Sequence, residues 1–206
     1  MGKCSLVKMK KPVLYIIGLI STCFGVAVIL KTDWGLDAWN GVFAGLEMIT
    51  PFSIGIWSIV IQSCFWLTAS VMNKKTDWLC AIPILFKGIF LDLSKTAISF
   101  VNAPNNLISD SVYYFIGYFL IAIGTGIYVA TGYPKMPIDG LMMALSVFFS
   151  WSIKKARLLI ELCGFILLLL VHGPLGIGTI IATFTIGYVV STAHNLARKW
   201  LFNQKT

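Results

Sequence analysis

The feature that most constrains this chain is an uncharged run of 19 residues, 12–30. A helix of that length spans about 28 Å, close to the ~30 Å hydrocarbon core of a bilayer. Four lysines precede the run, and no small-residue cleavage site follows it. We therefore expect an uncleaved first transmembrane helix.

Five more long apolar stretches follow, at residues 54–72, 78–101, 111–131, 156–171 and 175–193. Two shorter stretches, 38–49 and 138–149, have about a dozen residues each, which is too short for a full crossing. With 58% hydrophobic and only 12% charged residues, the chain is not a soluble domain. These patterns predict an all-α membrane protein, a single bundle over 1–206 of about six transmembrane helices plus two short half-membrane helices.

The two halves of the sequence resemble each other. At an offset of 99 residues, positions 15–92 and 114–191 share thirteen identities without gaps, including the pairs Gly18 with Gly117 and Gly25 with Gly124. Asn40 corresponds to Asp139, and each directly precedes a matched glycine. This register predicts an internal duplication, with repeat A at about 12–101 and repeat B at about 111–197.

The basic residues indicate the topology. If the short helices dip in and return, thirteen Lys and Arg residues lie on the cytoplasmic side against one outside, with both termini cytoplasmic. If the short helices cross fully, the chain has eight spans and the count becomes ten against four. The six-span topology is favoured. It places three crossings in each repeat, so the repeats are inverted relative to each other.

The repeat segments resemble the YczE/YyaS/YitT-type family of bacterial integral membrane proteins. The stretch GLDAWNGVFAGLEMITPFSIG resembles the family's Gly-Leu-x-Pro-Trp-Asp stretch, with Ala38 and Asn40 in place of its Pro and Asp. MPIDGLMMAL, then Arg157 and Glu161, then GPLGIGT match the family pattern more fully. Members are described as membrane proteins or as candidate transporters, so the resemblance implies a multipass membrane protein of a bacterial cytoplasmic membrane.

The starts of the two short helices are the first candidate site. A half-helix inside a membrane protein has backbone N–H groups that protein or water must satisfy. Asn40 and Asp139, each followed by a glycine (Gly41 and Gly140), supply polar groups there. They could form a substrate or ion site, with the helix N-termini favouring an anion and Asp139 a cation or proton. Alternatively, they are N-caps, and the glycines permit close packing.

Charged residues inside the predicted spans add further candidates for a substrate or ion pathway. Arg157 and Glu161 share a helical face at a spacing of four, and they form either a structural ion pair or a site where Glu161 takes up a proton. Gln62 is the uncharged repeat partner of Glu161. Lys87 and Asp92 lie within the third span, as a cavity wall or a structural network, and Asp92 is spaced to pair with Lys95.

These residues favour a transporter or permease that moves a small solute through a cavity between the repeats. The alternative is a non-transporting accessory protein that scaffolds a partner enzyme or complex at the membrane. No catalytic, metal-ligating or cofactor-binding pattern stands out, and Gly178, in GPLGIGT, is expected in a structural turn rather than a phosphate loop. We expect no enzyme activity, no cofactor and no nucleic-acid partner; the lipid bilayer is the expected environment, and a homodimer is possible for so short a chain.

Overall fold

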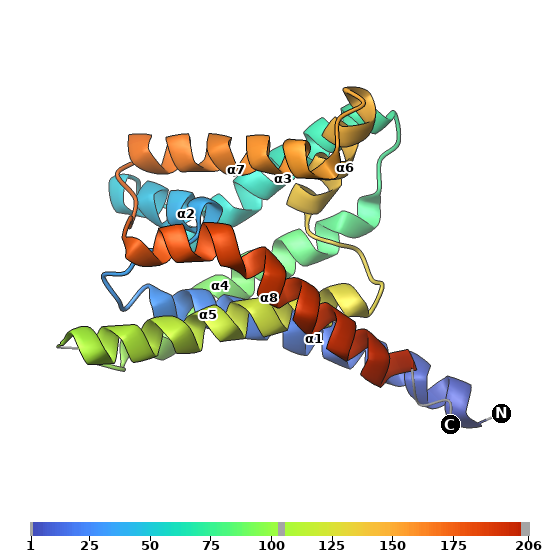
Figure 1. Ribbon diagram of the computed structural model, residues 1–206, viewed down its shortest axis with the longest axis horizontal. Coiled ribbons are helices and arrows are strands. Elements are labelled where there is room, and N and C mark those ends of the chain that lie inside the picture. The colour runs from blue at the N-terminus through green and yellow to red at the C-terminus, as the bar shows by residue number, and fades with distance from the viewer. Residues whose placement is uncertain (1, 103–105, 203–206) are drawn as a thin grey trace.

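The computed structural model describes residues 2–102 and 106–202, and these form helices and connecting turns without any strand (Figure 1). The elements are α1 (Gly2–Ile29), α2 (Ala38–Ile49), α3 (Ile54–Asn73), the 3-10 turn η1 (Trp78–Cys80), α4 (Ala81–Ser99), α5 (Leu107–Ala130), α6 (Pro137–Phe148), α7 (Ile153–Leu170) and α8 (Ile177–Phe202). Six long helices and two 12-residue helices confirm the predicted all-α fold.

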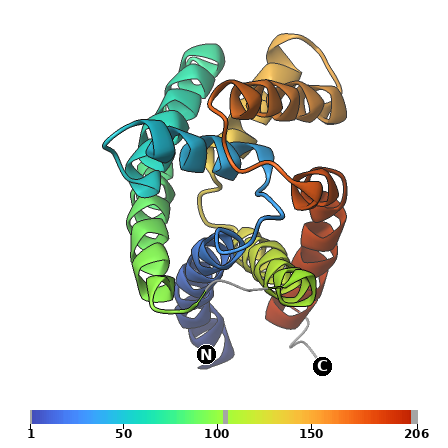
Figure 2. The same ribbon diagram turned by 90° about the vertical axis from the view of Figure 1, so that its left-hand side faces the viewer.

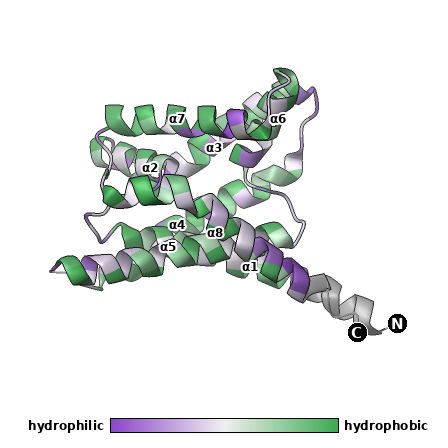
Figure 3. Cartoon of the chain, viewed as in Figure 1, coloured by the Kyte–Doolittle hydropathy of each residue, from purple (hydrophilic) through white to green (hydrophobic). Residues whose placement is uncertain are grey.

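Four helices are long and apolar enough to cross a membrane, over Lys11–Ile29, Ile54–Asn73, Leu107–Ala130 and Ile177–Trp200. The other two long helices, α4 and α7, have 19 and 18 residues but contain more charged residues. Figure 3 shows hydrophobic residues along most of α5 and α7, with hydrophilic residues near the start of α7 beside α6. The chain is therefore a membrane protein whose charged residues are concentrated in particular parts of the bundle.

Helices α1 and α5 cross at four glycines. A Cβ atom on Gly18 would lie 2.7 Å from the carbonyl oxygen of Gly124, and a Cβ atom on Gly117 would lie 2.6 Å from that of Gly25. Only glycine permits backbones to approach so closely. The repeat offset maps the first of these contacts onto the second, so the crossing has approximate two-fold symmetry.

The packing of the other helices has the same approximate two-fold symmetry. When α1 to α4 are exchanged with α5 to α8, the pair α1·α4 becomes α5·α8, α2·α3 becomes α6·α7, and α2·α7 becomes α6·α3, and all of these pairs pack together. Short helices α2 and α6 lie toward opposite ends of the long axis, whereas α1 begins and α8 ends at the same end (Figure 1). This is the arrangement that an inverted repeat produces.

One pair breaks the pattern: α3 packs along α4, but α7 does not pack along α8. The two pairs lie on opposite sides of the bundle (Figure 2). At the α3·α4 contact, a Cβ atom on Gly88 would lie 2.8 Å from the carbonyl oxygen of Gly55. Lys154 stands at the position of Gly55 in the second half. Because every residue other than glycine has a Cβ atom, the same close approach of backbones is excluded there.

Candidate functional site

A cavity of about 300 Å³ lies inside the bundle, and all eight α-helices or the residues at their starts contribute to its wall. Six charged side chains line it, three acidic and three basic: Asp37, Asp139, Glu161, Lys87, Lys135 and Arg157. Lys135 and Arg157 are exposed overall, whereas the other four are partly buried. The exposed members of this charged set therefore lie where α6 and α7 begin.

The structure brings six of the seven predicted pathway residues to this cavity: Asn40, Gln62, Lys87, Asp139, Arg157 and Glu161. The seventh, Asp92, is not among the lining residues. Its carboxylate accepts hydrogen bonds from Ser53 Oγ at 2.6 Å and from the Gly55 backbone N–H at 2.8 Å. Asp92 thus joins α4 to the start of α3, a structural role.

The start of α2 is organised by Asp37, which is not among the site residues predicted from the sequence. Asp37 is the N-cap, and its carboxylate accepts from the Asn40 backbone N–H and, at 2.8 and 3.1 Å, from the Asn40 side-chain amide. Asn40 is therefore the third residue of the helix and not its cap, contrary to the alternative interpretation above. Asp three residues before Asn at a helix start is a capping signal that could have identified Asp37.

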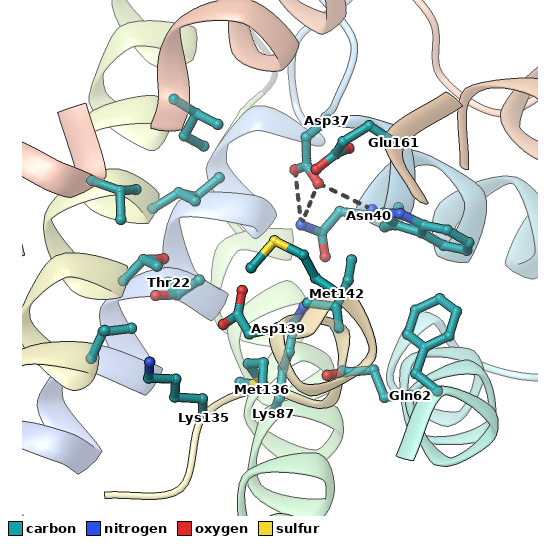
Figure 4. Close-up of a pocket in the computed structure, with 18 of the residues that line it drawn as sticks. Thr22, Asp37, Asn40, Gln62, Lys87, Lys135, Met136, Asp139, Met142 and Glu161 are labelled. Carbon is teal, nitrogen blue, oxygen red and sulfur yellow. Dashed lines mark hydrogen bonds between the residues drawn. The ribbon is translucent and has the colours of Figure 1, made fainter. Parts of the chain in front are cut away.

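Asn40 is 6% exposed, and its Oδ1 atom is buried without a hydrogen-bond partner among the described residues. In Figure 4 this carbonyl points into the cavity, while the amide nitrogen faces Asp37. A buried carbonyl without a partner carries a desolvation cost of about 1–3 kcal/mol. It is therefore available to a donor inside the cavity.

The start of α6 differs from that of α2. Its N-cap position is Met136, which makes no side-chain capping bond, and Pro137 follows at the first helical position, where no backbone N–H is needed. Asp139 lies in the first turn and is not an N-cap either. It interacts electrostatically with Arg157, Lys135 and Lys87. The N-terminus of α2 is thus occupied by the Asp37 carboxylate, whereas the anion site expected at the start of α6 stays a prediction.

The charges of the cavity are not matched in close ion pairs. Within the described ranges, the one salt bridge joins Lys95 to Glu47. This corrects the predicted pairing of Asp92 with Lys95 and excludes a close Arg157–Glu161 pair. Lys87 Nζ instead lies 5.5 Å from the centre of the Phe43 ring, a cation–π contact.

The three predicted structural glycines behave differently. A Cβ atom on Gly41 would lie 2.7 Å from Leu168 Cδ1, and one on Gly178 would lie 2.7 Å from the Trp34 carbonyl oxygen, so both glycines permit close packing. Gly140 has no atom within 4 Å of such a Cβ, so close packing does not explain it. Across the part of the chain that the structure describes, no group of three or more His, Cys, Asp or Glu residues could hold a metal ion.

The helical fold, its apolar spans and the charged internal cavity define an integral membrane protein. The chain belongs to DUF6198, a family of unknown function whose sequence model matches residues 9–195. The predicted resemblance to the YczE and YyaS proteins is confirmed by the relatives described next.

The chain is 26% identical over 168 residues to the uncharacterised protein YyaS of Bacillus subtilis, covering 81% of this chain and 84% of YyaS. It is 26% identical over 179 residues to the uncharacterised membrane protein YczE of the same organism, covering 85% and 81%. An uncharacterised protein of Haemophilus influenzae is 26% identical over 172 residues, covering 84% and 78%. No solved structure shows significant similarity to the chain.

Proposed function

We propose that this protein is a small-solute transporter or permease of a bacterial cytoplasmic membrane, with the cavity as its solute site. The observation that carries the proposal is the presence of six charged side chains around one cavity of about 300 Å³ without a close ion pair between them. Charged groups are costly at membrane depth unless they are paired or serve a polar pathway. A polar solute inside the cavity would compensate these charges.

The arrangement of the helices supports the same proposal. Short helices in corresponding positions of two inverted halves, with a polar site between them, are typical of secondary transporters. Here α2 and α6 both reach the cavity, from opposite ends of the bundle. In this proposal the long helices make six crossings, and both termini face the cytoplasm because most basic residues gather there.

Flux into liposomes tests the function. The purified protein is reconstituted and screened with small anionic, cationic and zwitterionic solutes. We expect flux of at least one class, and Asp139→Asn or Glu161→Gln should reduce it. The control is Asp33→Asn, which removes an exposed carboxylate in the α1–α2 loop, outside the cavity. Absence of flux for every class, together with a stoichiometric protein partner on purification, would instead favour the accessory-protein alternative.

A further inference from the structure

Two carboxylates and one amide carbonyl face the same part of the cavity. Asp37 and Glu161 interact electrostatically, and Figure 4 shows them on the same side of the site. The unpartnered Oδ1 of Asn40 points from there into the cavity (Figure 4), and it is held in place because the amide nitrogen of the same side chain donates to Asp37. These residues offer three hydrogen-bond acceptor groups, two carboxylates and one carbonyl, and two negative charges.

A protonated primary amine fits these three acceptors. An ammonium group carries one positive charge and three N–H donors, and it accepts no hydrogen bond. Asp37, Glu161 and Asn40 Oδ1 could each accept a hydrogen bond from one of its three N–H groups. A metal ion is a poorer match because no cluster of three ligands of the usual kinds is found among the described residues.

The three basic residues lie at different places along the cavity wall. Figure 4 shows Lys135 on the far side of Asp139 from the group of Asp37 with Asn40, whereas Lys87 interacts electrostatically with both Asp37 and Asp139. Arg157 interacts electrostatically with both Asp139 and Glu161. The wall as a whole carries three charges of each sign. A ligand that carries both signs would meet complementary charge at both of its ends.

We propose that the cavity binds a zwitterion, with its primary ammonium group between Asp37, Asn40 and Glu161 and its carboxylate toward Lys135. This inference rests on the proposed function in that it takes the cavity to be the solute site. A cavity of about 300 Å³ is at the lower end of ligand pockets, which limits the solute to a small molecule.

A series of aminocarboxylates tests the proposal. The probes are glycine, β-alanine, 4-aminobutyrate and 6-aminohexanoate, which differ in the distance between the charged ends. Binding is measured on the purified protein in detergent by calorimetry. We expect one chain length to bind best, and butylamine and butyrate, which each carry one charge, to bind about tenfold more weakly or worse, as loss of one charged hydrogen-bonding end implies.

Two variants separate the two ends of the ligand. Glu161→Gln should weaken residual butylamine binding and leave butyrate binding unchanged, whereas Lys135→Gln should do the reverse. The trimethylated analogue of the best aminocarboxylate should lose binding because it has no N–H donor. Circular dichroism melting curves check that both variants fold.

The outcome distinguishes this inference from the proposed function. If butylamine or butyrate binds as tightly as every aminocarboxylate, or if no aminocarboxylate binds the folded protein, the zwitterion proposal is wrong. The transporter proposal would still stand in that case if a singly charged solute is transported in liposomes. If neither binding nor flux is found for any solute class, both proposals fail.

Discussion

Ser53 Oγ donates a hydrogen bond of 2.6 Å to Asp92 Oδ2, and this contact ties the first residue before α3 to the middle of α4. The second oxygen of the same carboxylate accepts from the Gly55 backbone N–H at 2.8 Å. Ser191 stands at the repeat position of Asp92, and no such link joins α7 to α8 within the described part of the chain. The Asp92 carboxylate is therefore one contact, beside the Gly55–Gly88 approach, by which the two halves differ.

Replacing Asp92 should destabilise the protein without acting on the cavity directly. Asp92→Ala removes the acceptor for Ser53 and for the Gly55 backbone N–H, and we expect it to lower the free energy of unfolding by about 2–4 kcal/mol because both bonds involve a charged group. Thermal unfolding in detergent, followed by circular dichroism, measures the effect. Ser191→Ala is the matched control and should change stability little. Equal loss in both variants would contradict the structural role of Asp92.

The unpacked α7·α8 pair predicts that one substitution has opposite effects in the two halves. Gly88→Ala places a Cβ atom 2.8 Å from the Gly55 carbonyl oxygen and even closer to Ile59, and it should lower the melting temperature clearly. In Gly187→Ala the nearest atom, Arg157 Nη2, is 3.7 Å away. This variant should be neutral or stabilising by up to about 1 kcal/mol, since alanine favours helix more than glycine does. A large loss of stability in Gly187→Ala would show that α7 and α8 pack closely.

The short helices give a second matched pair. Gly41→Ala should destabilise the protein because its Cβ atom would meet Leu168, whereas Gly140→Ala has open space around the new methyl group. We expect a melting temperature that falls in Gly41→Ala and stays the same or rises in Gly140→Ala. If the two variants behave alike, α6 packs as tightly as α2.

The sequence predicted the fold well because its dominant signal is the length of its apolar runs. Apolar runs and the 99-residue register identified every helix, and the boundaries 38–49 match α2 (Ala38–Ile49). Other helix boundaries differ from the predicted ones where a capping residue sets the start of the helix. Helix α7 begins at Ile153, three residues before the predicted 156, because Ser152 accepts a hydrogen bond from the Lys155 backbone N–H. A hydropathy run does not record such caps, but Ser152 aligns with the capping Ser53 in the other repeat.

The candidate site was only partly predictable. Six of the predicted residues line the cavity, and they stand out in the sequence because a charged or amide group within an apolar run is conspicuous. The partner of Lys95 was predicted wrongly, because Lys95 pairs with Glu47, which lies 48 positions away in sequence and on another helix. Helix spacing describes neighbours on one helix, whereas these contacts depend on how separate helices pack. Asp37 and Lys135 were missed because both lie in turns between the apolar segments.

Cysteine labelling tests the six-span topology. Single cysteines at Asn73 and Asn102, in a variant without native cysteines, flank α4 and are both exposed. We expect a membrane-impermeant thiol reagent to label them from opposite sides of the membrane, with Asn73 accessible from the cytoplasmic side. Labelling of both positions from the same side would contradict a single crossing by α4.

Asp37 allows stability to be separated from solute recognition. Its carboxylate caps α2 through the Asn40 backbone N–H and also lines the cavity. Asparagine caps helices about as well as aspartate, so Asp37→Asn should change the free energy of unfolding by no more than about 0.5 kcal/mol, whereas Asp37→Ala should cost about 1 kcal/mol. Both variants remove the negative charge, and both should reduce flux or binding of an amine-bearing solute about tenfold or more. If Asp37→Asn keeps full flux while Asp37→Ala loses it, then Asp37 acts only as a helix cap, and the amine must be recognised elsewhere in the cavity.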